Sequence, residues 1–139
     1  MVIWNTEYDE AQLENIKIVE ERLSLEFPKD YLECVLKYQG GKPSLCNIMV
    51  DENTIVQFSC LLTFLAFDEL DILDVYNSFK KNIPSGLIPF GLGSDSYLFC
   101  FNYRLGEPPV ISICRPSDTD EQKVVDISNS FTDLTAKLF

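Results

Sequence analysis

The segment from Glu21 to Ser44 constrains the fold more than any other part of this chain of 139 residues. It ends one run of apolar residues at helical spacing, places Pro28, begins a second such run and stops at Gly40-Gly41. Proline is well accepted at the first position of a helix, where its missing N–H costs nothing, and glycine adopts the left-handed conformation that ends one. The segment therefore predicts two helices joined by a short bend, each with an apolar face for a shared core.

The first of these helices is expected to begin near Asp9, because Asp9 and Gln12 have the spacing of a capping box. Apolar residues recur at helical spacing in both predicted helices: Leu13, Ile16, Val19 and Leu23 in the first, Tyr31, Leu32, Val35 and Leu36 in the second. Nearby, Trp4 and Tyr8 are either packing residues, which is the more common role, or anchors of an interface.

After Gly41 the pattern changes to that of strands. The runs "LCNIMV" and "TIVQF" flank a turn at residues 51–53, and "CLLTFLAF" is either a strand or another buried run. A helix is expected from Asp68, then strands at "LIPFGLG", "SYLFCFNY", "PVISICR" and "KVVDI", and a closing helix capped by Ser130 and Asp133. This order predicts a single α+β domain over residues 1–139, with a mainly antiparallel sheet packed against about four helices.

The side chains present exclude most kinds of catalytic site. The sequence has no His, so neither a Ser-His-Asp nor a Cys-His system can be built. Its five cysteines form no CxxC motif and lie in apolar contexts, which indicates buried, reduced, structural thiols. The protein is therefore predicted to be no enzyme, with no catalytic residues, no cofactor and no metal.

Two segments nevertheless resemble ligand sites. The acids of "FDELDILDV" are Asp68, Glu69, Asp71 and Asp74. Asp68 and Asp71 would share one helical face with Asp74 nearby, and the cluster would either bind a divalent cation or stabilise a helix N-terminus; we favour the second. The run "FGLGSDS" either cradles a phosphate or turns between two strands, and a lone GxG motif favours the turn.

The net charge of −11 restricts the partners. Such a field repels phosphate backbones and anionic membranes and attracts basic proteins, although an acidic surface also simply favours solubility. We expect no direct nucleic-acid binding and no membrane span, since no apolar run approaches the ~18 residues a span needs. The N-terminal residues lack the basic region of a signal peptide, and with the reduced thiols this predicts a cytoplasmic location.

Three motifs, in order, resemble the SUKH superfamily, the Smi/Knr-type domain. The first, "IVEERLSLEFPKDYLECVLKYQGGKPS", has Gln39 where the family usually has Asn; its matching residues are Glu20, Leu23, Leu25, Pro28, Asp30, Tyr31, Leu36, Gly40 and Gly41. The second, "IPSGLIPFGLGSDSYLFCFN", resembles the central strand pair, and the third, "ISNSFTDLTAKL", the closing helix. Ser94-Asp95-Ser96 departs from the family, which has Gly-Asn or Gly-Asp there.

The resemblance implies an α+β domain that binds proteins and, for a compact acidic chain, an immunity protein. The implied partner is a cognate toxin with a basic nuclease domain, such as the RNase domain of an LXG-type polymorphic toxin, which an acidic inhibitor surface could block. From charge and expected exposure, not from the family, we predict that the acids facing this partner include Asp51, Glu52, Asp68, Glu69, Asp71 and Asp95. Alternatives are a general interaction or regulatory scaffold without a toxin partner and a carboxylate-dependent hydrolase. Monomer and dimer both fit the sequence.

Overall fold

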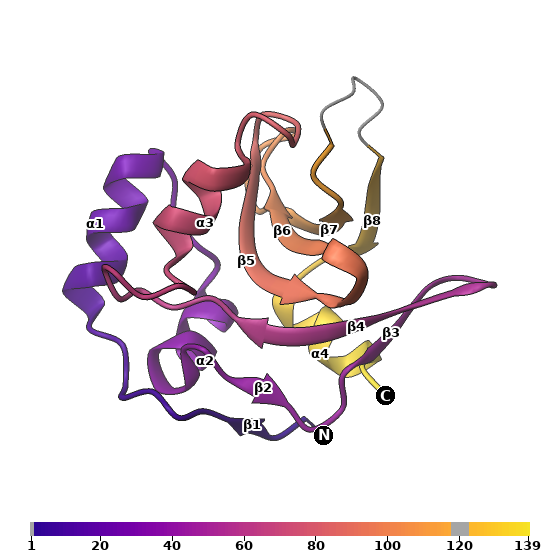
Figure 1. Cartoon of the computed structure of the whole chain (residues 1–139), viewed down its shortest axis with the longest axis horizontal. Helices are drawn as coiled ribbons and strands as arrows, with labels where there is room; N and C mark the ends of the chain where they lie inside the picture. Colours follow the sequence, from indigo (N-terminus) through magenta and orange to yellow (C-terminus); the bar gives the residue numbers. More distant parts are fainter. Residues whose placement is uncertain (1, 118–122) are drawn as a thin grey trace.

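Six strands pair in chain order as one antiparallel sheet (Figure 1). They are β3 (Asn47–Asp51), β4 (Thr54–Leu61), β5 (Leu87–Gly93), β6 (Leu98–Asn102), β7 (Val110–Cys114) and β8 (Val124–Ser128). A second, two-stranded antiparallel sheet joins β1 (Trp4–Asn5) to β2 (Lys42–Pro43). The computed structural model describes residues 2–117 and 123–139. Every strand predicted from the sequence is present, whereas the β1–β2 pair was not foreseen.

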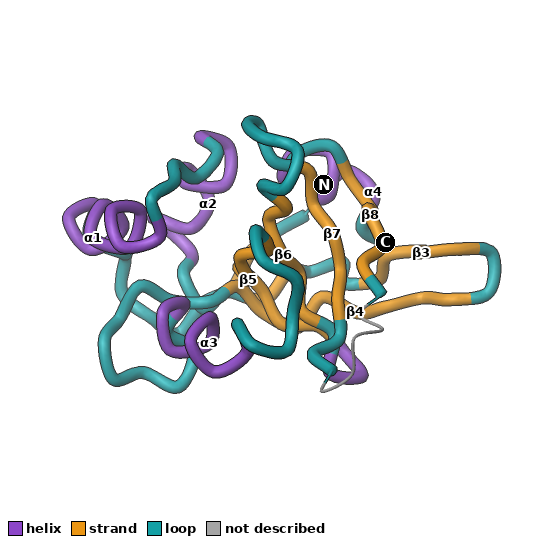
Figure 2. Tube along the Cα trace, turned by 90° about the horizontal axis from the view of Figure 1, so that it is seen from above, coloured by secondary structure: helices purple, strands orange, loops and turns teal. Residues whose placement is uncertain are grey.

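Four helices cover this sheet: α1 (Leu13–Leu23), α2 (Lys29–Tyr38), α3 (Ile72–Phe79) and α4 (Phe131–Lys137). The first three gather at one end of the molecule, and the β3–β4 hairpin extends from the other end (Figures 1 and 2). The terminal helix α4 contacts both α2 and β8. The predicted α+β class, with about four helices on a mainly antiparallel sheet, is confirmed.

Both faces of the sheet are covered, which explains why its central strands are apolar throughout. Along β6, Phe99 and Phe101 belong to the main core shared with the helices, while Leu98 and Cys100 belong to a smaller cluster on the opposite face. This alternation follows from the two-residue period of a strand. The smaller cluster is closed by Ile83 in the connection after α3. A run that looks continuously apolar in sequence thus serves two separate cores.

Tyr31 of α2 lies at the centre of the main core. Its ring packs edge-on against Phe101 at 4.9 Å between centroids and against Phe131 of α4 at 5.6 Å. Phe101 in turn stacks on Phe90 of β5 at 4.3 Å. Aromatic pairs of this geometry contribute about 0.5–1.5 kcal/mol beyond the area they bury. The ring cluster therefore joins α2, the sheet and α4, elements far apart in the sequence.

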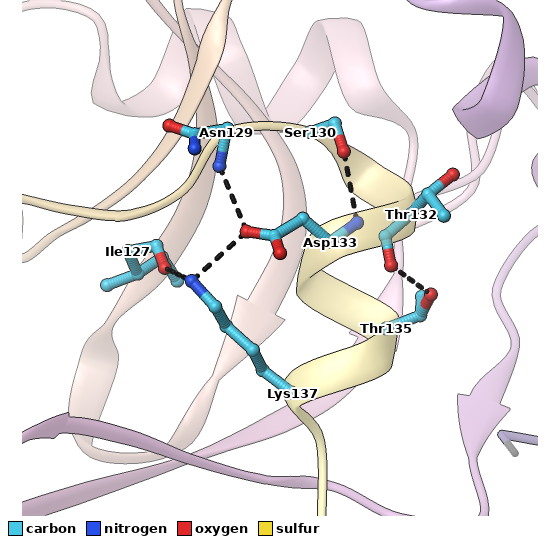
Figure 3. Close-up of polar contacts among 7 residues, drawn as sticks. All are labelled: Ile127, Asn129, Ser130, Thr132, Asp133, Thr135 and Lys137. Atoms are coloured by element: carbon cyan, nitrogen blue, oxygen red, sulfur yellow. Dashed lines mark hydrogen bonds and ion pairs between the residues drawn. The ribbon is translucent and has the colours of Figure 1, made fainter.

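The closing helix has the predicted cap (Figure 3). The Ser130 hydroxyl accepts a hydrogen bond from the Asp133 N–H at 3.0 Å, and the Asp133 carboxylate accepts one from the Asn129 N–H at 3.3 Å. Lys137 lies 3.0 Å from the same carboxylate and donates to the Ile127 carbonyl. The hydrogen bond from Lys137, and then the one from the Asn129 N–H, hold the pKa of the Asp133 carboxyl below its usual value. The reciprocal cap defines where α4 begins.

The starts of α1 and α2 differ from the sequence prediction. The helix α1 begins at Leu13, and its N-cap Gln12 makes no side-chain capping bond, so the capping box at Asp9 is wrong. The Asp9 carbonyl instead accepts a hydrogen bond from the Gln39 side chain, which holds the chain out of the helical path. Pro28 is the N-cap of α2, one residue before the first helical position. A tertiary contact and a one-residue shift account for these differences.

Candidate functional site

The segment between β4 and α3, residues 62–71, forms a closed turn. Its two ends are joined because the Thr63 N–H donates to the Leu70 carbonyl and the Ile72 N–H donates to the Thr63 carbonyl, both at 2.8 Å. Leu62, Thr63 and Phe64 are buried, so "CLLTFLAF" is strand only as far as Leu61 and then a connection that is buried up to Phe64 and exposed at its end. We call residues 62–71 the β4–α3 turn.

Asp68 holds this turn from within. Its carboxylate accepts hydrogen bonds from the Thr63 hydroxyl and the Leu70 N–H, both at 3.1 Å, and from the Tyr8 hydroxyl at 3.3 Å. Burial, and then the Asp68 charge, raise the pKa of Tyr8, so the phenol remains a donor. Both carboxylate oxygens are therefore engaged inside the protein, and we assign Asp68 a structural role in the turn.

The expected helix start at Asp68 is wrong, and so is the shared helical face of Asp68 and Asp71. The helix begins at Ile72, and Asp71 is its N-cap, accepting a hydrogen bond from the Asp74 N–H at 3.3 Å. Only 6% of Asp71 is exposed, and burial raises the pKa of its carboxyl. The expected exposure of Asp71 is therefore also wrong, whereas the cap-stabilising interpretation is confirmed for Asp71 and Asp74 but not for Asp68 and Glu69.

The other predicted partner-binding acids are exposed but dispersed. Asp51 and Glu52 lie at the tip of the β3–β4 hairpin, and Asp95 lies in the short 3-10 helix η1 (Ser94–Ser96) between β5 and β6. Glu69 lies in the β4–α3 turn, at the end of the molecule opposite the hairpin (Figures 1 and 2). The structure thus does not bring the six predicted acids onto one face.

The chain between Lys42 and Lys80 carries no Lys or Arg. Residues 43–79 include both the hairpin tip and the β4–α3 turn. The six acids of this stretch are Asp51, Glu52, Asp68, Glu69, Asp71 and Asp74. Asp74 is exposed on the first turn of α3, close in sequence to exposed Glu69. The end of the molecule at which α1, α2 and α3 gather, which we call the helix end of the molecule, therefore presents acidic side chains. Residues 43–79 supply no cation beside them.

Gln39 is a fully buried polar residue that sequence reasoning assigned no structural role. Its Nε2 donates to the Asp9 carbonyl at 2.8 Å, and its Oε1 accepts from the Phe64 N–H at 3.0 Å. Its own carbonyl accepts a hydrogen bond from the Thr6 hydroxyl. Gln39 therefore ties the N-terminal segment to the β4–α3 turn. Its place in the family motif, where Asn is usual, is the signal that could have revealed this role.

Two other residues of the same motif also act within the fold. Glu20 Oε2 accepts a hydrogen bond from the Phe27 N–H at 2.7 Å, which fixes the bend between α1 and α2. Asp30 Oδ2 accepts from both the N–H and the hydroxyl of Thr132, each at 2.9 Å, and so fastens α2 to the start of α4. These polar motif residues are structural.

The remaining candidates have packing or turn roles. Trp4 packs edge-on against Phe58 and stacks on Phe131, with ring centroids 5.8 Å and 6.1 Å apart, as expected for a packing residue. The run "FGLGSDS" ends β5 and forms η1. There the Asp95 carbonyl accepts a hydrogen bond from Arg115 Nε at 2.9 Å, which favours the interpretation as a turn.

The described residues hold no group of three or more His, Cys, Asp or Glu side chains placed to bind a metal ion. Three of the cysteines are buried and two are half-buried, and all five are free thiols. Burial raises the pKa of Cys34 to about 12 and also raises that of Cys60, Cys100 and Cys114. At neutral pH these four remain poorly nucleophilic thiols. Among residues 2–117 and 123–139, no helix is both long enough and apolar enough to cross a membrane.

The model of the SMI1 / KNR4 family (SUKH-1) matches residues 10–137. This range includes all four helices and the whole six-stranded sheet. No curated protein matches the chain.

Proposed function

The chain belongs to the SMI1 / KNR4 family (SUKH-1), and from this premise we propose that it is an immunity protein that binds and neutralises a cognate toxin. Membership of the family indicates an immunity-type function, exercised by binding a protein partner. In our proposal the partner is a basic nuclease domain, the RNase domain of an LXG-type polymorphic toxin. The complex forms in the cytoplasm, where free thiols are stable.

The observation that carries the proposal is the acidic stretch of residues 43–79, which holds no base and leaves Glu69 and Asp74 exposed at the helix end of the molecule. A nuclease has to attract phosphate and therefore presents cations around its active site. An acidic protein competes with the nucleic acid for those cations, and its field accelerates encounter. We place the interface at the helix end of the molecule, around Glu69 and Asp74. Inhibition would then follow from covering the RNA-binding surface, without any chemistry by the inhibitor.

The test is co-expression with the toxin-like protein encoded beside this gene. We expect growth to be restored, and the purified pair to form a stable complex whose affinity falls as salt is raised. Toxicity that persists, with no complex between the purified proteins, would contradict the proposed function. In that case the scaffold interpretation would take its place.

Local charge at the helix end should control the rate of association. Glu69→Lys reverses an exposed charge in the β4–α3 turn, and we expect it to slow association with the toxin domain about 3–10-fold at low salt. Glu52→Lys is the matched control, since it makes the same change in an exposed turn at the opposite end of the molecule. We expect it to change the rate less than about twofold. Stopped-flow mixing over a series of salt concentrations measures both; equal slowing by the two variants would show that net charge, and not a local face, governs association.

A further inference from the structure

The β4–α3 turn places a bulky aromatic residue in a backbone conformation that suits glycine. The Asp68 N–H donates to the Leu65 carbonyl at 3.2 Å, which makes residues 65–68 a β-turn with Phe67 as its second central residue. Phe67 has a φ of +69°. Turns with a positive φ at this position take Gly or Asn, because a Cβ atom crowds the backbone there. The other described non-glycine residues with positive φ are small or polar: Ser24, Asp95 and Ser96.

The side chain of Phe67 gains nothing from this placement inside the protein, since it is fully exposed. A single exposed apolar residue is ordinary on a protein surface and would carry no inference. Leu105 is such a case, because it is almost fully exposed and the neighbouring Gly106 takes the positive φ of its turn. Phe67 combines full exposure with backbone strain, and strain of this kind persists where the surrounding structure enforces it.

The enforcing contacts are those of Asp68, the next residue. Its carboxylate is held by Thr63, Leu70 and Tyr8, and the ends of the turn are closed by the Thr63–Leu70 hydrogen bond. These hydrogen bonds hold the backbone of the turn, and with it the position of the Phe67 Cβ, before any partner arrives. Preorganisation of this kind lowers the entropic cost of ordering an interface loop on binding.

The surroundings of Phe67 have the composition of an interface. A mainly apolar hollow of about 260 Å³ lies between α1 and the turn; Ile18, Phe64, Ala66 and Leu73 contribute apolar lining, and Arg22 and the buried Asp71 also line it. Ile18 is half-exposed. Glu69 in the same turn as Phe67, and Asp74 in the first turn of α3, are also exposed. An exposed aromatic beside an apolar hollow, with charged residues around it, matches the core-and-rim pattern of protein interfaces.

We infer that Phe67 is the hydrophobic anchor of the interface with a basic protein domain, while Glu69 and Asp74 face that domain's cations at the rim. The inference rests on the proposed function and locates its binding surface. The partner domain offers an apolar pocket for the ring, bordered by Lys or Arg. A second copy of this chain fits less well, because each copy carries a net charge of −11 and the same acids beside Phe67.

Phe67→Gly separates binding from folding, because glycine relieves the strained φ while it removes the ring. We expect this variant to unfold at the same temperature as the wild type or higher. Its Kd for the purified domain of the toxin encoded beside this gene should rise at least about 30-fold. Phe67→Tyr, which keeps the ring, should bind within about threefold of the wild type. Ile55→Thr is the matched control, since it replaces a half-exposed apolar side chain by a polar one in the hairpin at the opposite end. It should leave the Kd unchanged within about threefold.

The outcomes distinguish this inference from the function on which it rests. If the wild type neutralises the toxin and Phe67→Gly binds equally well, the anchor is wrong and the immunity function stands. If the wild type neither binds the toxin domain nor restores growth, the proposed function fails and the anchor fails with it. Sedimentation analysis of the protein alone tests whether a second copy of this chain, and not a toxin domain, binds the Phe67 ring. Dissociation of a wild-type dimer by Phe67→Gly, with toxin binding unchanged, would assign the ring to self-association and overturn the proposal.

Discussion

Replacing Gln39 with alanine is expected to lower the free energy of unfolding by about 2–4 kcal/mol. The side chain is fully buried, and its two polar atoms pair with the Asp9 carbonyl and the Phe64 N–H. Alanine leaves the buried Phe64 N–H without a partner and opens a cavity between the N-terminal segment and the β4–α3 turn. Equilibrium unfolding in urea, followed by circular dichroism, measures the loss.

The matched control for this variant is Gln12→Ala. Gln12 is an exposed N-cap whose side chain makes no capping bond, so its replacement should change stability by less than about 0.5 kcal/mol. Gln39→Asn should retain part of the stability, because asparagine carries the same amide on a shorter stem. A loss below about 1 kcal/mol for Gln39→Ala would mean that water replaces both hydrogen bonds, and the bracing role of Gln39 would be wrong.

Gly40→Ala is expected to destabilise the protein by about 2–5 kcal/mol, for two separable reasons. The first is the backbone: Gly40 has a φ of +69°, which costs a residue with a Cβ about 1–2 kcal/mol. The second is steric, because a Cβ at Gly40 would lie 2.5 Å from Cε2 of the Tyr8 ring. That ring cannot move aside without disturbing its hydroxyl contact with Asp68. Overpacking of this kind costs a further 1–3 kcal/mol or so.

A second glycine isolates the backbone contribution. Gly106 also has a positive φ, and a Cβ there would meet nothing within 4 Å, so Gly106→Ala should cost only about 1–2 kcal/mol. In a Tyr8→Ala background, the cost of Gly40→Ala should fall to the same level, and the difference is the coupling energy of the contact. Equal losses for both glycines in the wild-type background would show that the Tyr8 contact contributes nothing.

The contacts of Gln39 and Gly40 explain how motif positions that identify the family act within the fold. Each of them, like Glu20 and Asp30, braces one segment against another through a hydrogen bond or a close approach. The region that they brace includes the β4–α3 turn, from which Phe67 and Glu69 project. A shared framework can therefore present side chains that differ from one partner to the next.

Much of the architecture followed from the sequence because it depends on local chemistry. The bend at Pro28, the strands from Asn47 to Ser128 and the Ser130 cap were predicted because proline, alternating apolar residues and capping side chains act on their immediate neighbours. The start of α1 was not predicted correctly, because the side chain of Gln39, 30 residues away along the chain, donates a hydrogen bond to the Asp9 carbonyl. The placement of Asp68 and Asp71 on one helical face was also wrong, because both lie in the turn that the Thr63 backbone hydrogen bonds close.

By itself the sequence determined the α+β class, the family, the charge and the absence of a histidine-based catalytic site, because composition and local periodicity are properties of the chain alone. The tertiary structure decided which acids remain available to a partner. It buried Asp71, engaged Asp68 inside a turn, and separated the exposed acids onto opposite ends of the molecule. It also decided that Phe67, one of ten phenylalanines, is held outward in a strained turn. Exposure and strain depend on contacts between distant segments, and those contacts exist only once the chain has folded.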